Sequence, residues 1–161
     1  MNLNVSQLVA LAQNAGWSGS DLATAVAIAL AESSGNPNAY NPETASGAQP
    51  GQGSYGLWQI YLTAHPEDAS QNLYDPQTNA NDAYAIYSAA GNSFAPWSTF
   101  KSGAYLAQVP AVGLVLAGDS ALPELAAVGG GSSDFSAPDQ SGMLLVVAGG
   151  VIAFLVLSRY L

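Results

Sequence analysis

A single acid, Glu32, ends an almost uncharged stretch of the sequence, SDLATAVAIALAE. The stretch is apolar nearly all round after Leu22, which is typical of a buried central helix. Burial disfavours the charged form of a carboxylate, and the negative end of the helix dipole disfavours it further. Both effects raise the pKa of Glu32. A carboxylic acid that stays protonated near neutral pH is what a general acid requires, so we predict acid–base chemistry at Glu32.

The segment GSYGLWQI offers polar and aromatic groups that could face a substrate. Gln59 is a polar side chain in an apolar run, which favours a place in a binding cleft over a core amide. Gly56 lets the backbone approach closely beside such a cleft. Trp58 is predicted to lie in the core. Further cleft candidates, each with core packing as the alternative, are Tyr55, Tyr84 and Trp97.

Four pieces of the sequence occur in the order found in the lysozyme-like superfamily. They are Glu32-Ser33 with Pro37 a few residues on, then Gly56-Leu57-Trp58-Gln59-Ile60, then NLYDPQTNANDAYAIY, then PWSTFKSGAY. Over roughly residues 5–105 the chain therefore resembles this superfamily, and most closely its soluble lytic transglycosylase (SLT) branch. The resemblance implies a mainly α fold of the SLT or goose type, with a small loop or hairpin lobe. It also implies that Glu32 is the catalytic acid and that Ser33 steadies the site.

The activity that the resemblance implies is cleavage of peptidoglycan between N-acetylmuramic acid and N-acetylglucosamine. A lytic transglycosylase needs one acid, because Glu32 can protonate the glycosidic oxygen and then accept the proton of the muramic C6 hydroxyl. Most glycosidases use two carboxyl groups. Glu43 lies where some inverting relatives keep a second acid, so a muramidase that uses water is the alternative, although a mobile surface glutamate is the simpler interpretation of Glu43. A non-catalytic structural or glycan-binding module is the alternative from a different class.

The composition limits the partners of the chain. Its 161 residues favour one domain with a tail. The chain has no cysteine and a single histidine, His65, so we expect no disulfide, metal or cofactor. The formal net charge is −9, and Lys101 and Arg159 are the only Lys or Arg residues, which argues against nucleic acid binding through a basic patch. A glycan would therefore be bound by neutral polar and aromatic side chains.

The elements that must position these residues are mostly helices. Capping residues and helix breakers predict a first helix capped by Ser6 and ended by Gly16, and a second capped by Ser20 or Asp21 that runs to about residues 32–34. A short helix is expected over residues 55–62. A further helix should run from Asp75-Pro76 to Gly91, followed by a shorter segment over residues 98–105. Any strands are expected within about residues 39–54.

The C-terminal part of the chain differs in composition from the rest. We expect the lysozyme-like domain over residues 1–110, a partly disordered linker over 111–141 and a transmembrane helix over 142–161. Residues 142–157 hold no charged or strongly polar side chain, and Arg159 and Tyr160 suit a membrane interface. The N-terminal residues lack the basic region of a signal peptide.

A wall-cutting domain with a C-terminal anchor and no signal peptide resembles the peptidoglycan-degrading enzymes of phage virions. We therefore expect a virion membrane as the location. The expected partners are glycan strands, the lipid bilayer and virion proteins. A single-pass protein of the bacterial cell envelope is the alternative.

Overall fold

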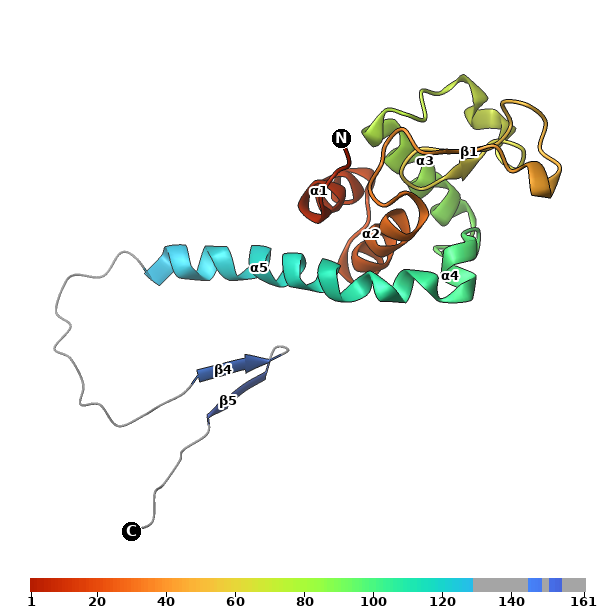
Figure 1. Ribbon diagram of the computed structural model, residues 1–161. Helices are drawn as coiled ribbons and strands as arrows, with labels where there is room; N and C mark the ends of the chain where they lie inside the picture. The colour runs from red at the N-terminus through yellow and green to blue at the C-terminus, as the bar shows by residue number, and fades with distance from the viewer. Residues whose placement is uncertain (129–144, 149–150, 155–161) are drawn as a thin grey trace, which may run out of the picture. The chain divides into compact units, whose positions relative to one another are not determined.

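The structure is a computed structural model of the 161-residue chain. It describes the backbone of residues 1–128, 145–148 and 151–154, and the side chains of residues 1–118. The chain divides into two compact units, Met1–Ala127 and Val128–Leu161. The first unit is mainly helical, as the sequence predicts (Figure 1).

Helices make up most of the first unit, and a small sheet follows its second helix. The α-helices are α1 (Val5–Ala15), α2 (Gly19–Ser33), α3 (Pro76–Ala89), α4 (Ser98–Ser102) and α5 (Val109–Val128). The 3-10 helices are η1 (Thr44–Ser46), η2 (Pro66–Ser70) and η3 (Ala104–Ala107). The strands of the sheet are β1 (Tyr40–Asn41), β2 (Ser54–Tyr55) and β3 (Ile60–Tyr61).

Helix α2 is the central helix of the first unit. Its residues Leu22 and Ala25–Ala29 are buried, and it packs against α1, α4 and η3. The helix ends at Ser33, because Ser34 takes a left-handed backbone conformation with φ of 53°. Glu32 therefore stands in the last turn, where the helix leaves the core, as the sequence predicts.

The helix caps agree only in part with those predicted. Asn4, not Ser6, caps α1: the Asn4 side chain accepts a hydrogen bond from the Gln7 N–H, and the Gln7 side chain accepts one from the Asn4 N–H. This reciprocal pair satisfies two N–H groups at once, which one serine cannot do. Ser18 precedes α2, slightly before the predicted caps. The prediction for Asp75 is confirmed, since its carboxylate accepts a 2.8 Å hydrogen bond from the first turn of α3.

A small antiparallel sheet takes the place of the short helix predicted over residues 55–62. Its strands run in the order β1-β2-β3, and Tyr55 pairs with a residue on each neighbour. The turn from β2 to β3 has left-handed backbone at Gly56, φ 72°, and at Gln59, φ 48°, which a right-handed helix excludes. The predicted short helix is therefore wrong, and the strands extend beyond residues 39–54. The sheet is the small hairpin lobe that the resemblance implied.

Trp58 is fully buried in the core, as predicted. Its indole N–H donates a 3.0 Å hydrogen bond to the Ala25 carbonyl on α2, and its ring stacks on Trp17 with centroids 5.5 Å apart. The Trp58 carbonyl accepts a 2.8 Å hydrogen bond from the indole N–H of Trp97, which caps α4. The β2–β3 turn, α2 and α4 are thus joined through tryptophans.

Helix α5 spans residues 109–128 and so crosses the domain boundary predicted at residue 110. Val112, near the start of this helix, is fully buried and fixes it to the domain. Gly113 lies inside α5, where one glycine costs the helix only about 1 kcal/mol relative to alanine. The rest of the predicted linker, residues 129–141, lies outside the described residues.

The described part of residues 142–161 forms strands where the sequence predicts a helix. Strand β4 (Leu145–Ala148) pairs antiparallel with β5 (Val151–Phe154). Two of the four residues in each strand are Val or Ile, which favour strands. The other residues of the predicted helix lie outside the described ones. Among the helices of the described residues, none has the length and apolar character needed to cross a membrane.

Candidate active site

Glu32 is half-buried at the end of α2 and receives a hydrogen bond from α4. The Thr99 hydroxyl donates to Glu32 Oε1 at 2.7 Å. Thr99 lies in the first turn of α4, and α4 packs against α2. The bond holds one oxygen of the carboxyl group in a defined position.

Burial raises the pKa of Glu32, and this is the largest of the effects on it. Hydrogen bonds from the hydroxyl and the backbone of Thr99 favour the charged form and lower the pKa in part. The negative charge of Glu43 raises it again. The net shift is upward, in the direction that a general acid needs.

Glu43 is held in place, contrary to its interpretation as a mobile surface residue. Its Oε1 accepts hydrogen bonds from the Ser54 hydroxyl at 2.8 Å and the Asn41 amide at 2.9 Å. Its Oε2 accepts a longer one, 3.4 Å, from the Ser46 hydroxyl. The donors come from β1, β2 and η1. The hairpin lobe therefore holds a second carboxylate in a defined position.

Two adjoining hollows, of about 670 and 290 Å³, border Glu32, and we call them together the Glu32 cleft. Glu32, Glu43 and Gln59 line both hollows. The acid from α2 and the second carboxylate from the hairpin lobe thus face one space. The cleft is also rich in neutral polar side chains, namely Asn36, Asn38, Asn41, Ser46, Ser54 and Ser98. Amide and hydroxyl groups of this kind suit the hydroxyl and acetamido groups of a sugar.

Gln59 lies in the wall of the Glu32 cleft, where the sequence predicts a substrate-facing side chain. Its amide nitrogen donates to the carbonyls of Gly56, at 2.8 Å, and Ala39, at 3.3 Å. These bonds tie the β2–β3 turn to the segment before β1, so Gln59 also fixes the shape of the lobe.

Ser33 also borders the Glu32 cleft, and its hydroxyl donates to the Ala29 carbonyl at 2.9 Å. Gly56 is buried against α3 instead of facing the cleft. A Cβ at Gly56 would lie 2.3 Å from the Leu73 carbonyl oxygen and 2.4 Å from the Asn79 side-chain nitrogen. The need for glycine at position 56 therefore comes from packing as well as from its left-handed backbone.

The aromatic candidates lie in different places. Trp97 is only 6% exposed and belongs to the core, but one edge borders the smaller hollow of the cleft. Tyr55 packs against Tyr40 and Tyr74 in the lobe, and the lining of the cleft includes Tyr40 but not Tyr55. Tyr84 lies beside Trp17 and borders a separate hollow that shares no residue with the cleft. The structure therefore does not bring Tyr55 and Tyr84 to Glu32.

Two residues that sequence reasoning missed support this site. Thr99 holds the acid through its hydrogen bond to Glu32. The sequence offered one indication of this role: Thr99 carries a hydroxyl group and lies in PWSTFKSGAY, one of the four segments that resemble the family. Asn79 is fully buried. Its Oδ1 accepts a 2.9 Å hydrogen bond from the backbone N–H of Trp58, and its Nδ2 donates to the backbone carbonyls of Tyr55 and Leu73. Asn79 thus fixes the β2–β3 turn to α3.

The family model of a lysozyme-like domain, SLT_3, matches residues 9–99 of the chain. This range is more than half of the 161 residues, and it contains Glu32, Glu43, Gln59 and Thr99. No curated protein and no solved structure matches the chain. The chain therefore belongs to the SLT_3 family of lysozyme-like domains.

Proposed function

We propose that the protein is a lytic transglycosylase that cuts the glycan of peptidoglycan, with Glu32 as its general acid. The lysozyme-like SLT domain indicates a glycosidase that acts on peptidoglycan. The observation that supports the role of Glu32 is its half-buried carboxyl group, with a raised pKa, on a cleft lined by neutral polar groups. Burial favours the protonated form of a carboxylic acid, which is the form that a general acid needs.

In the proposed reaction, the Glu32 proton passes to the glycosidic oxygen between N-acetylmuramic acid and N-acetylglucosamine. The C1–O bond of the muramic residue breaks, and N-acetylglucosamine leaves with the proton as its new hydroxyl group. Glu32, now a carboxylate, accepts the proton of the muramic C6 hydroxyl group. At the same time the C6 oxygen forms a bond to C1 of the same muramic residue. The product is a 1,6-anhydromuramic end, no water is consumed, and Glu32 is protonated again.

Thr99 is a positioning residue in this scheme. Its hydroxyl donates to Oε1 of Glu32 and so orients the carboxyl group that delivers and recovers the proton. Glu43 borders the same cleft as a fixed carboxylate, but this reaction needs no second carboxyl group.

Hydrolysis by a muramidase is the second candidate, and the fixed position of Glu43 on the cleft favours it. In that reaction Glu43 would take a proton from water as the water attacks C1. We place it second because both oxygens of Glu43 already accept hydrogen bonds from Ser54, Asn41 and Ser46. Proton abstraction would have to compete with those donors.

The products of digestion separate the two candidates. We expect mass spectrometry of digested cell walls to show fragments that end in 1,6-anhydromuramic acid, lighter by one water molecule than hydrolysed ones. We also expect Glu43→Gln to keep activity within about tenfold, well short of the roughly 10²–10⁴-fold that loss of a general base costs. Reducing muramic ends together with a large loss in Glu43→Gln would establish the muramidase instead.

We further propose that residues 142–161 attach the domain to a lipid bilayer, in a phage virion or, as the alternative, in the bacterial cell envelope. The support is the run of residues 142–157 without a charged side chain. A chain truncated after Gln140 should remain in the aqueous phase of a detergent phase separation and still cut cell walls. The full chain should enter the detergent phase. Val151→Lys in the full chain is the matched control and should shift it toward the aqueous phase. Full-length protein found entirely in the aqueous phase would contradict attachment.

A further inference from the structure

The Thr99 hydroxyl reaches Glu32 from a helix that is too short to fix its own position. Helix α4 has only five residues, and its first turn has no side-chain cap. A helix of this length is unstable by itself, because most of its backbone hydrogen-bonding groups lie in the end turns. Contacts with other elements must therefore decide where Thr99 stands.

Two hydrogen bonds join the start of α4 to distant parts of the chain. The indole N–H of Trp97, the N-cap residue, donates to the Trp58 carbonyl at 2.8 Å. The Thr99 hydroxyl donates to Glu32 Oε1 at 2.7 Å. Trp97 is buried, so its hydrogen bond lies in a medium that strengthens it. A bond of this length fixes direction as well as distance.

Trp58, which accepts the bond from Trp97, is itself held firmly. Its backbone N–H donates to Asn79 Oδ1 at 2.9 Å, and its indole N–H donates to the Ala25 carbonyl at 3.0 Å. Ala25 and Glu32 both belong to α2, and their positions are close to two helical turns apart. They therefore lie along the same side of this helix.

These hydrogen bonds form a closed path that begins and ends on α2. The path runs from Ala25 to Trp58, from the Trp58 carbonyl to Trp97, along the first turn of α4 to Thr99, and back to α2 at Glu32. The positions along a closed path depend on one another. Loss of the bond between Trp97 and Trp58 would therefore free Thr99 to move relative to Glu32.

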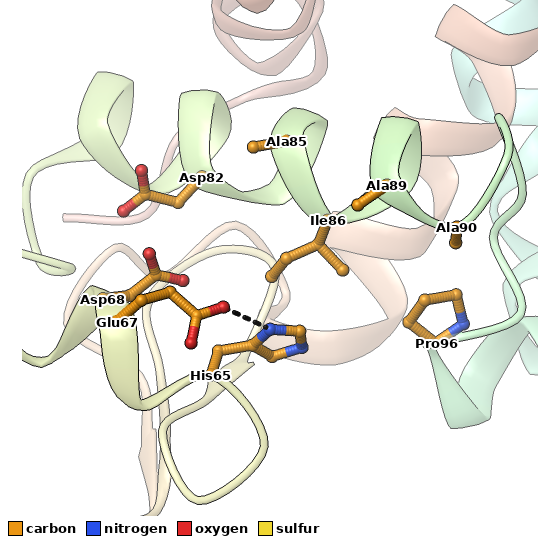
Figure 2. Close-up of a pocket in the computed structure, with 9 residues that line it drawn as sticks. All are labelled: His65, Glu67, Asp68, Asp82, Ala85, Ile86, Ala89, Ala90 and Pro96. Carbon is orange, nitrogen blue, oxygen red and sulfur yellow. Dashed lines mark hydrogen bonds and ion pairs between the residues drawn. The ribbon is translucent and has the colours of Figure 1, made fainter.

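The segment before α4 has no comparable link on its other side. Figure 2 shows Pro96, the residue before Trp97, on the wall of a hollow of about 380 Å³ that Ile86 and Ala89 of α3 also line. Proline has no N–H group, and apolar packing is not directional. The indole hydrogen bond of Trp97 therefore supplies the direction that this packing lacks.

We propose that Trp97 is a positioning residue, whose indole N–H holds α4 so that the Thr99 hydroxyl stays on the Glu32 carboxyl group. This rests on the proposed role of Glu32 as the general acid. Trp97 acts through Thr99 and not by stacking on a sugar, because its ring is buried and only one edge borders the smaller hollow of the cleft.

The position of Thr99 affects the ionisation of Glu32. The hydrogen bonds of Thr99 favour the charged form of Glu32 and lower its pKa, and the charge of Glu43 raises it. The other titratable side chains that share the cleft or lie on elements packed against α2 are Tyr40, Tyr61, Lys101 and Tyr105. Glu43 belongs to the hairpin lobe, so loosening α4 removes the effect of Thr99 and keeps that of Glu43. The pKa of Glu32 should then rise.

Trp97→Phe removes the indole N–H and keeps an aromatic ring in the core. The alkaline limb of the pH–activity profile of cell-wall cleavage should move to higher pH, as in Thr99→Val. The double variant Trp97→Phe/Thr99→Val should have the same limb as Thr99→Val alone, because both changes break one path. If Trp97→Phe does not fold, benzothienylalanine at position 97 gives the same test, since it has the size of tryptophan and sulfur in place of the N–H.

Tyr87→Phe is the matched control for a buried aromatic residue that loses one hydrogen bond. The Tyr87 hydroxyl donates to Asp21 Oδ2 at 2.5 Å, and Tyr87 borders a hollow that shares no residue with the Glu32 cleft. This variant should melt at a lower temperature than the wild type and keep the wild-type limb. An equal movement of the limb in Tyr87→Phe and Trp97→Phe would show general loosening of the core and would overturn the proposal.

Titration of Glu32 by NMR keeps the test independent of cleavage. In the full chain with isotope-labelled glutamate carboxyl groups, the signal of Glu32 is the one that Glu32→Gln lacks. Without substrate, its midpoint should lie at higher pH in Trp97→Phe than in the wild type.

Three results would reject the positioning role of Trp97. One is an unmoved midpoint in folded Trp97→Phe, and another is a pair of shifts that add in the double variant. The third is a raised KM with an unmoved midpoint, which is the result expected of a residue that stacks on the sugar. A wild-type protein that cleaves no cell wall would instead contradict the proposed function, and the NMR midpoint would then decide the role of Trp97 alone.

Discussion

Glu32→Gln should abolish cleavage of cell walls while the domain melts at the same temperature. Glutamine keeps the size of the side chain and an oxygen that can accept the hydrogen bond of Thr99, but it has no proton to give to the glycosidic oxygen. Removing a general acid costs typically about 10²–10⁴-fold in rate. Turbidity loss of purified cell walls, with circular dichroism melting in parallel, measures both quantities.

Glu124→Gln on α5 is the matched control, because it is the same chemical change outside the residues of the candidate site. It should leave the rate of cleavage as in the wild type. Activity of Glu32→Gln within tenfold of the wild type, with unchanged melting, would remove Glu32 from its role as the acid.

The raised pKa of Glu32 is tested through Thr99. The hydrogen bonds of Thr99 lower this pKa, so Thr99→Val should raise it further. Since Glu32 must be protonated to act as an acid, the alkaline limb of the pH–activity profile should move to higher pH in Thr99→Val. Thr99→Ser retains the hydroxyl and should restore the wild-type limb. A profile that does not move would show that Thr99 does not act on the ionisation of Glu32.

Asn79→Ala should be the most destabilising polar substitution among those considered. It removes three hydrogen bonds of a buried side chain, one from the backbone N–H of Trp58 and two to the backbone carbonyls of Tyr55 and Leu73. Each lost bond or unpaired buried group costs about 1 kcal/mol or more, so the free energy of unfolding should fall by about 3 kcal/mol. The melting temperature should drop on the order of 10 °C.

Asn81→Ala is the control for Asn79. It has the same residue type on the same helix, but Asn81 is exposed and accepts only one hydrogen bond, from Gln77. An exposed pair of this kind is worth roughly 0.2–0.5 kcal/mol. If the two variants melted at similar temperatures, Asn79 would not hold the β2–β3 turn to α3.

The sequence predicted those parts of the fold and site that depend on local patterns. The apolar run before Glu32 marks a buried helix whatever surrounds it, and Asp75-Pro76 starts a helix by the chemistry of its own first turn. Trp58 was predictable as a core residue because a large apolar ring favours burial. These features need no knowledge of distant parts of the chain.

The features that the sequence did not predict depend on contacts across the chain. Thr99 meets Glu32 from 67 positions away, and Ser54 holds Glu43 from 11 positions away. The turn after Tyr55 resembled a short helix because its left-handed residues are set by packing against Asn79, which no local pattern reveals. Position in the fold, and not residue type, made Glu43 part of the cleft.

The three tryptophans, Trp17, Trp58 and Trp97, are at most 6% exposed, and all lie within Met1–Ala127. Tryptophan fluorescence of the chain therefore reports on this unit alone, since residues 128–161 contain no indole. Indoles in an apolar core emit at shorter wavelength than indoles in water, so unfolding should shift the emission to the red. The stacked pair, Trp17 on Trp58 with an interplanar angle of 22°, should also give a near-ultraviolet dichroic signal that disappears when the β2–β3 turn separates from the connection between α1 and α2. The domain thus carries its own optical probe, which can follow its folding in the full chain, in detergent or on a membrane, without a label.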